Sequence, residues 1–132
     1  MTDRANDAKR GTTELILGAL AGSVLLPFLQ AVVTKAGEDA YQAIRDRLPW
    51  GSRRKASAEL KEAGVVSLAA RDARVVLRLP QRITPLMAAR LENVRLPVDR
   101  PGWAVVSWDE VQSRWVVEQV TEPPDSATRV EP

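Results

Sequence analysis

The stretch that decides the fold is Leu15–Thr34, LILGALAGSVLLPFLQAVVT, which carries no charged residue. A helix of this length spans about 30 Å, the thickness of the hydrocarbon core of a bilayer. Apolar residues continue beyond it at spacings of three and four as far as Leu48, with charged residues on the other faces. We therefore predict one long helix from Thr13 to Leu48, kinked by Pro27.

Three interpretations of the apolar run are open. A membrane-spanning helix is favoured by its length, by its lack of charge and by a small-residue face for close helix–helix contact, made of Gly18, Ala19, Gly22 and Ser23. A helix buried in a protein core, under a sheet or a second subunit, is the alternative, because Pro27 and many alanines weaken membrane insertion. A secretory signal peptide fits less well, since the helical pattern continues past any cleavage site.

The flanks of the run give an orientation if it spans a membrane. More basic residues follow the run than precede it, and the more basic side belongs in the cytoplasm. The arginine-rich, alanine-rich composition is typical of high-GC bacteria. We therefore predict a protein of the bacterial inner membrane with its C-terminal domain in the cytoplasm, and a cytoplasmic protein as the alternative.

The chain divides into five predicted segments. These are a disordered leader, the long helix, a basic connector, a small folded domain and a disordered tail, at residues 1–11, 12–49, 50–63, 64–120 and 121–132. In the connector, Trp50 lies beside a basic run made of Arg53, Arg54 and Lys55. An aromatic ring next to positive charge suits an anionic membrane surface, and a solvated linker is the alternative.

The period of the apolar residues changes to two after Gly64. Pairing VVSLAA with ARVVLRL around Arg71-Asp72 predicts a hairpin with one buried face, formed by Val66, Leu68, Ala70, Ala73, Val75 and Leu77. Thr84 and Pro85 then start a short helix that we expect to reach Val94.

A second predicted hairpin follows in WAVVSWD-EVQS-RWVVEQV, residues 103–120. A loop at residues 110–113 pairs Trp108 with Trp115 and favours a core role for both rings, although a longer loop would move Trp115 to the other face. The predicted fold class is α+β: a long N-terminal hydrophobic helix, then a ββαββ unit with a four-stranded, mostly antiparallel sheet.

Composition argues against several classes of chemistry. The 132 residues include neither histidine nor cysteine, which removes the usual general base near neutral pH and the commonest metal ligands. We therefore predict that the protein is not an enzyme and that it needs no cofactor or metal. The net charge of +2 indicates no general attraction to polyanions. Nucleic-acid binding through Arg74, Arg78 and Arg82 is accordingly less favoured than a solvated face.

Two segments carry a resemblance to a known family. GALAGSVLLPFLQAVV at residues 18–33 and VVSLAARDARVVLRLP at residues 65–80 follow one another in an order that resembles the small effector-associated constant component proteins of actinobacterial conflict systems. The resemblance leaves the tryptophan-rich hairpin unmatched. It implies a non-enzymatic accessory component that acts beside a separate effector protein.

The sequence as a whole predicts a non-catalytic accessory or interaction module. We expect it to self-associate or to dock a partner through its N-terminal helix, most readily at a membrane. The alternative is a soluble homo-oligomer whose hydrophobic helix is buried in its own core or against a partner. A nucleic-acid-binding module is the less favoured third possibility.

Overall fold

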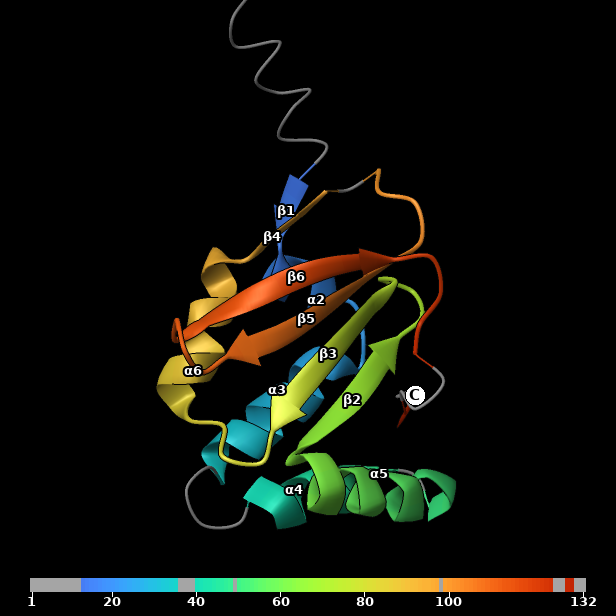
Figure 1. The fold of residues 1–132 in the computed structure, drawn as a ribbon, viewed down its shortest axis with the longest axis vertical. Coiled ribbons are helices and arrows are strands. Elements are labelled where there is room, and N and C mark those ends of the chain that lie inside the picture. Colours follow the sequence, from blue (N-terminus) through green and yellow to red (C-terminus); the bar gives the residue numbers. More distant parts are fainter. Residues whose placement is uncertain (1–12, 36–39, 49, 98, 125–127, 130–132) are drawn as a thin grey trace, which may run out of the picture.

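A central β-sheet with helices packed on one of its faces makes up the protein (Figure 1). The computed structural model describes residues 13–35, 40–48, 50–97, 99–124 and 128–129. The predicted leader, residues 1–11, lies outside these described residues. The mixture of helices and sheet confirms the predicted α+β class.

Of the helical elements described, four precede the main sheet along the chain, and two lie between its first and second hairpins. They are α2 Ile16–Leu20, α3 Leu25–Thr34, α4 Ala40–Arg47, α5 Trp50–Ala63, α6 Pro85–Ala89 and the 3₁₀ helix η1 Arg90–Asn93. The strands are β1 Thr13–Leu15, β2 Val65–Ala70, β3 Val75–Pro80, β4 Arg95–Pro97, β5 Trp103–Asp109, β6 Arg114–Val120 and β7 Thr128–Arg129.

The main sheet has the strand order β6-β5-β3-β2-β7. The pairs β2–β3 and β5–β6 are antiparallel hairpins, and α6 with η1 forms the crossover that makes β3 and β5 parallel. The four long strands therefore form the predicted ββαββ unit. Strand β7 adds to β2 in parallel, so two residues of the predicted disordered tail are part of the sheet. A separate two-stranded sheet joins β1 to β4.

The register of the first hairpin differs from the sequence prediction without changing its buried face. Ala70 lies opposite Val75 rather than Ala73, because the turn takes four residues instead of two. A shift of two residues in one strand returns every side chain to the same side of the sheet. Val66, Leu68, Val75 and Leu77 are fully buried, as predicted. Ser67, Ala69 and Val76 on the opposite face are buried too, so the prediction of a single buried face is wrong for this hairpin.

The second hairpin has the register of the shorter predicted loop. Trp108 lies opposite Trp115, and Asp109 lies opposite Arg114. The Asp109 carboxylate accepts hydrogen bonds from the backbone N–H groups of Val111 and Gln112, which stabilises the loop locally. The structure thus decides between the two loops that the sequence left open, and both tryptophans lie on the helix-covered face.

The prediction of one long helix from Thr13 to Leu48 is wrong. Residues 13–15 form β1, α2 ends at Leu20, and α3 begins only at Leu25. The Ser23 hydroxyl donates to the Leu20 carbonyl and accepts from the Leu25 N–H, which closes the break. Pro27 lies in the first turn of α3, where its missing N–H is not needed, so it starts a helix rather than kinking one.

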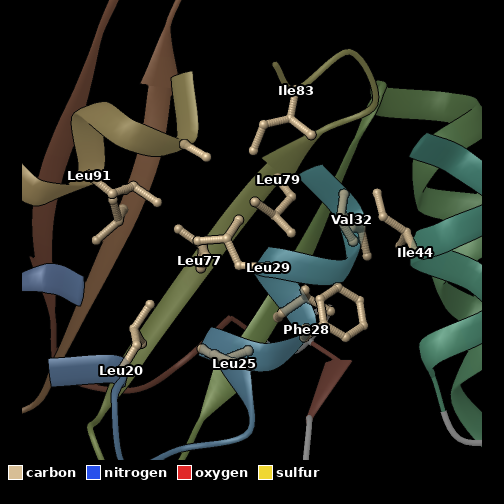
Figure 2. Close-up of a cluster of buried hydrophobic side chains, with 14 of the residues drawn as sticks. Leu20, Leu25, Phe28, Leu29, Val32, Ile44, Leu77, Leu79, Ile83 and Leu91 are labelled. Atoms are coloured by element: carbon tan, nitrogen blue, oxygen red, sulfur yellow. The ribbon is translucent and has the colours of Figure 1, made fainter. Parts of the chain in front are cut away.

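Burial explains why the apolar run divides. A straight helix over residues 13–48 would extend about 54 Å, whereas strands of six or seven residues extend only about 20–23 Å. Two short helices place their apolar faces on the sheet one after the other. Figure 2 shows Leu20 and Leu25 on the side of β3 that carries Leu77 and Leu79.

The apolar run is thus a main part of the protein's own core. Its fully or almost fully buried side chains are Ile16, Leu20, Leu25, Phe28, Leu29 and Val32. They belong to the same cluster as the inner face of β2, β3 and β5. Within the described part of the chain, no helix is long and apolar enough to cross a membrane. The predicted spanning helix therefore has no support in the structure.

The opposite face of the sheet carries a second, smaller cluster. Its buried members are Ala69, Val76 and Val105, with Trp103 and Val120 packed against them. No helix is drawn over this face of the described sheet (Figure 1). Arg78, on the same face, has an Nε–H that is buried without a hydrogen-bond partner among the described residues.

Candidate functional site

A groove of about 400 Å³ lies between the crossover segment and β6. We call it the arginine groove; its lining includes Arg90, Asn93, Arg95, Ser113, Arg114 and Trp115. Arg90 and Asn93 belong to η1, Arg95 begins β4, and Arg114 begins β6. Segments about 20 residues apart in the chain therefore supply its two walls.

One wall begins with a well-capped helix. The Thr84 hydroxyl accepts from the Met87 N–H, and Pro85 occupies the first helical position, which confirms the predicted helix start. The helix changes to the 3₁₀ form at Arg90. From there the Arg90 Nη1 donates a 2.7 Å hydrogen bond to the Ser113 carbonyl oxygen. This bond joins the crossover segment to the β5–β6 loop.

The tryptophan pair fixes the base of the groove. Trp115 is 7% exposed, and its indole N–H donates a 2.7 Å hydrogen bond to the Met87 carbonyl oxygen. Trp108 packs edge-to-face against it, with the ring centroids 5.3 Å apart. Because the Trp115 ring is buried, it is a structural element of the groove and offers no open face on which a base could stack.

The charged side chains that line the groove are all positive. Its lining contains three exposed arginines and no aspartate or glutamate. Guanidinium groups stay protonated throughout the physiological range and hold carboxylates or phosphates through paired N–H donors. The arrangement is therefore suited to binding an anionic group, with Asn93 and Ser113 as additional hydrogen-bonding residues.

A second groove, of about 210 Å³, lies between α3 and α6. Leu17, Leu26, Val33 and Ala89 are among its lining residues, which include no charged side chain. Apart from Gln30 its lining side chains are apolar, and it contains none of the residues predicted as sites.

A fourth arginine, Arg100, is buried and has a structural role. Its side chain is 5% exposed and donates hydrogen bonds to the carbonyl oxygens of Pro97, Ala73 and Arg74, at 2.8, 2.6 and 3.2 Å. Burial, with a smaller contribution from Arg74, lowers the pKa of Arg100, and Glu14 opposes the shift. Arg100 thus ties the β4–β5 connection to the β2–β3 turn.

The predicted helix–helix contact residues do not form one helical face. Gly18 and Ala19 are in α2, while Gly22 and Ser23 are in the turn before α3. Gly18 and Gly22 are exposed, and nothing lies within 4 Å of a Cβ placed at either position. Self-association through these residues stays a prediction, now without the continuous helix on which it rested.

The predicted basic surface lies on α5, apart from the groove lining. Arg53 stacks over Trp50, 4.4 Å from the ring centroid, and its guanidinium donates to the Leu48 and Asp46 carbonyl oxygens. Arg53 therefore caps the C-terminal end of α4. Arg54 and Lys55 are exposed on α5. An anionic contact at this surface remains a prediction.

The sequence did not identify the groove arginines as a site. Arg90 and Arg95 fit the polar side of a short helix, and Arg114 fits the end of a strand. The pairing of Asp109 with Arg114 correctly located Arg114 at the start of β6. Only the parallel crossover brings the three arginines together.

Two negative observations complete the description. The residues described by the structure contain no group of three or more His, Cys, Asp or Glu side chains able to hold a metal ion. Comparison with protein-family models, with curated proteins and with solved structures found no match to this chain.

Proposed function

We propose that this protein is a non-catalytic interaction module that docks an acidic polypeptide partner in the arginine groove. The observation that carries the proposal is the convergence of Arg90, Arg95 and Arg114 on one groove whose lining has no carboxylate. The proposal keeps the predicted interaction role but moves the docking surface away from the N-terminal apolar run. Most of the large side chains of that run are in the core, and only the small apolar groove beside α6 leaves part of it accessible.

Two features support a polypeptide partner rather than a nucleic acid. Three arginines line the groove, while the 19 basic and 17 acidic residues of the whole chain leave a net charge of only +2, so a long phosphate backbone would meet little excess positive charge. The aromatic ring in the groove is buried and unavailable for base stacking. A short acidic peptide needs neither a long basic surface nor an open aromatic ring. Its spaced carboxylates can each pair with one of the three guanidinium groups.

A titration with a fluorescent hexaglutamate peptide tests the proposal. We expect saturable binding in 50 mM NaCl, followed by fluorescence anisotropy, and about tenfold or greater weakening in the double variant Arg95→Gln/Arg114→Gln. Arg90 is left in place because its hydrogen bond to Ser113 also supports the loop.

Arg71→Gln/Arg82→Gln is the matched control, since it also removes two positive charges and both residues are exposed and outside the groove lining. Its affinity for the peptide should equal that of the wild type. Equal weakening in the control and in the double variant would show general charge attraction and would contradict the proposal. A thymidine oligonucleotide that binds more tightly than the peptide would contradict the choice of partner.

A further inference from the structure

We propose that the partner segment binds in an extended conformation, as an added strand along the outer edge of β6. The inference rests on the proposed function, because it takes the acidic partner as given and states how its backbone is held. Addition of a strand to a sheet edge uses main-chain hydrogen bonds for affinity and alternate side chains for specificity.

The two ends of the sheet differ in how their edges are covered. At the β2 end, β7 pairs with Leu68 and Ala69, and the Glu59 carboxylate accepts from the Ser67 N–H at 2.8 Å. These contacts occupy backbone groups that would otherwise pair with another strand. At the other end, β6 pairs with β5 only, and no described strand lies on its outer side.

Strand β6 is also suited to receive a partner strand. Its seven residues pair with β5 without a bulge, and it contains no proline, so its outer row of N–H and C=O groups is regular. The strand extends about 23 Å, enough for a peptide of six or seven residues. Natural proteins usually protect such an edge from pairing, and here no strand among the described residues pairs with it beside the charged groove.

The groove lies along the first part of this edge. Trp115 and Val117, on the helix-covered side of β6, line it together with Arg114. Arg95 lines it from β4, a strand whose only described partner is β1. A strand added to β6 would therefore have main-chain partners on one side, Arg90 and Arg95 beside the face that carries Trp115, and Arg114 at the start of β6.

Strand geometry sets the spacing of the acids. Successive side chains of a strand point to opposite faces, and alternate ones lie about 6.6–7 Å apart on the same face. A peptide with glutamate at every second position would thus direct all of its carboxylates toward the arginine side. Three consecutive glutamates would direct the middle one to the opposite face.

Two labelled peptides of equal charge test this geometry. The first is Thr-Glu-Thr-Glu-Thr-Glu-Thr, and the second is the same peptide with N-methyl groups on two adjacent central residues. Adjacent amides point to opposite sides of a strand, so one methyl group must remove a donor that faces β6. We expect the methylated peptide to bind wild-type protein at least about tenfold more weakly, because N-methylation blocks pairing while keeping every carboxylate.

A third peptide, Thr-Thr-Glu-Glu-Glu-Thr-Thr, has the same composition and controls for charge alone. We expect it to bind several-fold more weakly than the alternating peptide. Hydrogen exchange gives an independent readout: the alternating peptide should slow exchange of outward-facing β6 amides and leave α5 amides unchanged.

The outcomes separate this inference from the proposed function. Equal affinities for the methylated and unmethylated peptides, with binding still lost in Arg95→Gln/Arg114→Gln, would overturn strand addition and leave acidic docking intact. Binding that does not respond to the arginine substitutions would overturn both. Unchanged exchange of the β6 amides at saturation would also overturn strand addition.

Discussion

The indole N–H of Trp115 donates a 2.7 Å hydrogen bond to the carbonyl oxygen of Met87, which joins the second hairpin to the crossover helix. We expect Trp115→Phe to lower the free energy of unfolding by about 1–2 kcal/mol, because the ring is largely kept while the Met87 carbonyl loses its partner. Urea denaturation measures the change. A loss below about 0.3 kcal/mol would contradict a structural role for this bond.

Binding in the arginine groove should not depend on pH near neutrality. The chain has no histidine or cysteine, and arginine side chains and glutamate peptides keep their charges between pH 6 and 9. We expect constant affinity for hexaglutamate over this range, and weaker binding below about pH 4.5, where the peptide carboxylates become protonated. Anisotropy titrations at constant ionic strength provide the measurement. A midpoint near pH 7 would require another titrating group.

Replacing buried Arg100 with lysine should destabilise the protein by about 2 kcal/mol. An ammonium group cannot reproduce the planar set of donors that reaches the carbonyl oxygens of Pro97, Ala73 and Arg74. Arg71→Lys, at an exposed position in the neighbouring turn, is the control and should change stability little. Similar effects of the two substitutions in urea denaturation would argue against the bridging role.

The lowered pKa of Arg100 changes the stability of the folded state with pH in a defined direction. Its folded state holds the proton less tightly than its unfolded state, so the charged side chain opposes folding until the pH rises through the lowered pKa. Because the pKa of a guanidinium group ordinarily lies in the strongly alkaline range, this relief occurs far above neutral pH. We therefore expect no contribution of Arg100 to the change of wild-type stability between pH 6 and 8.

Two glycines with the same backbone conformation should respond very differently to alanine. Gly102 and Gly64 both have φ near +72°, but a Cβ at Gly102 would clash with the Val120 carbonyl oxygen, while Gly64 has open space. We expect Gly64→Ala to cost about 1 kcal/mol through backbone strain, and Gly102→Ala to cost about 3 kcal/mol. Thermal and urea unfolding can compare them directly. Equal costs would show that the contact at Gly102 relaxes freely.

The core role of the apolar run can be separated from a helix-contact role by two substitutions in α2. Leu20 is fully buried, so Leu20→Ala should destabilise the protein by about 3 kcal/mol. Gly18 is exposed with open space around it, so Gly18→Ala should raise stability by roughly 0.5–1 kcal/mol through helix propensity. A Gly18→Ala variant that instead disrupts an oligomer would support the contact face predicted from the sequence.

The sequence by itself determined the ββαββ unit. The period-two pattern identified the residues of the first hairpin that face the helices, including Leu68 and Leu77, but it missed the burial of Ala69 and Val76 on the opposite face. The predicted register of the first hairpin is wrong by two residues because its turn is longer than predicted. Each side chain nevertheless lies on the predicted face of the sheet. Thr84 and Pro85 likewise located a helix start, since a side-chain cap and a fixed φ act locally.

Only the tertiary structure decided how residues 13–48 divide and where the arginines meet. A membrane-spanning helix and two short buried helices can have the same apolar sequence. The short helices form here because the sheet that covers them is too short for one long helix. Arg90, Arg95 and Arg114 share a groove because a parallel crossover returns the chain beside β6. That proximity comes from the long-range pairing of β3 with β5, which no local pattern around the three arginines encodes.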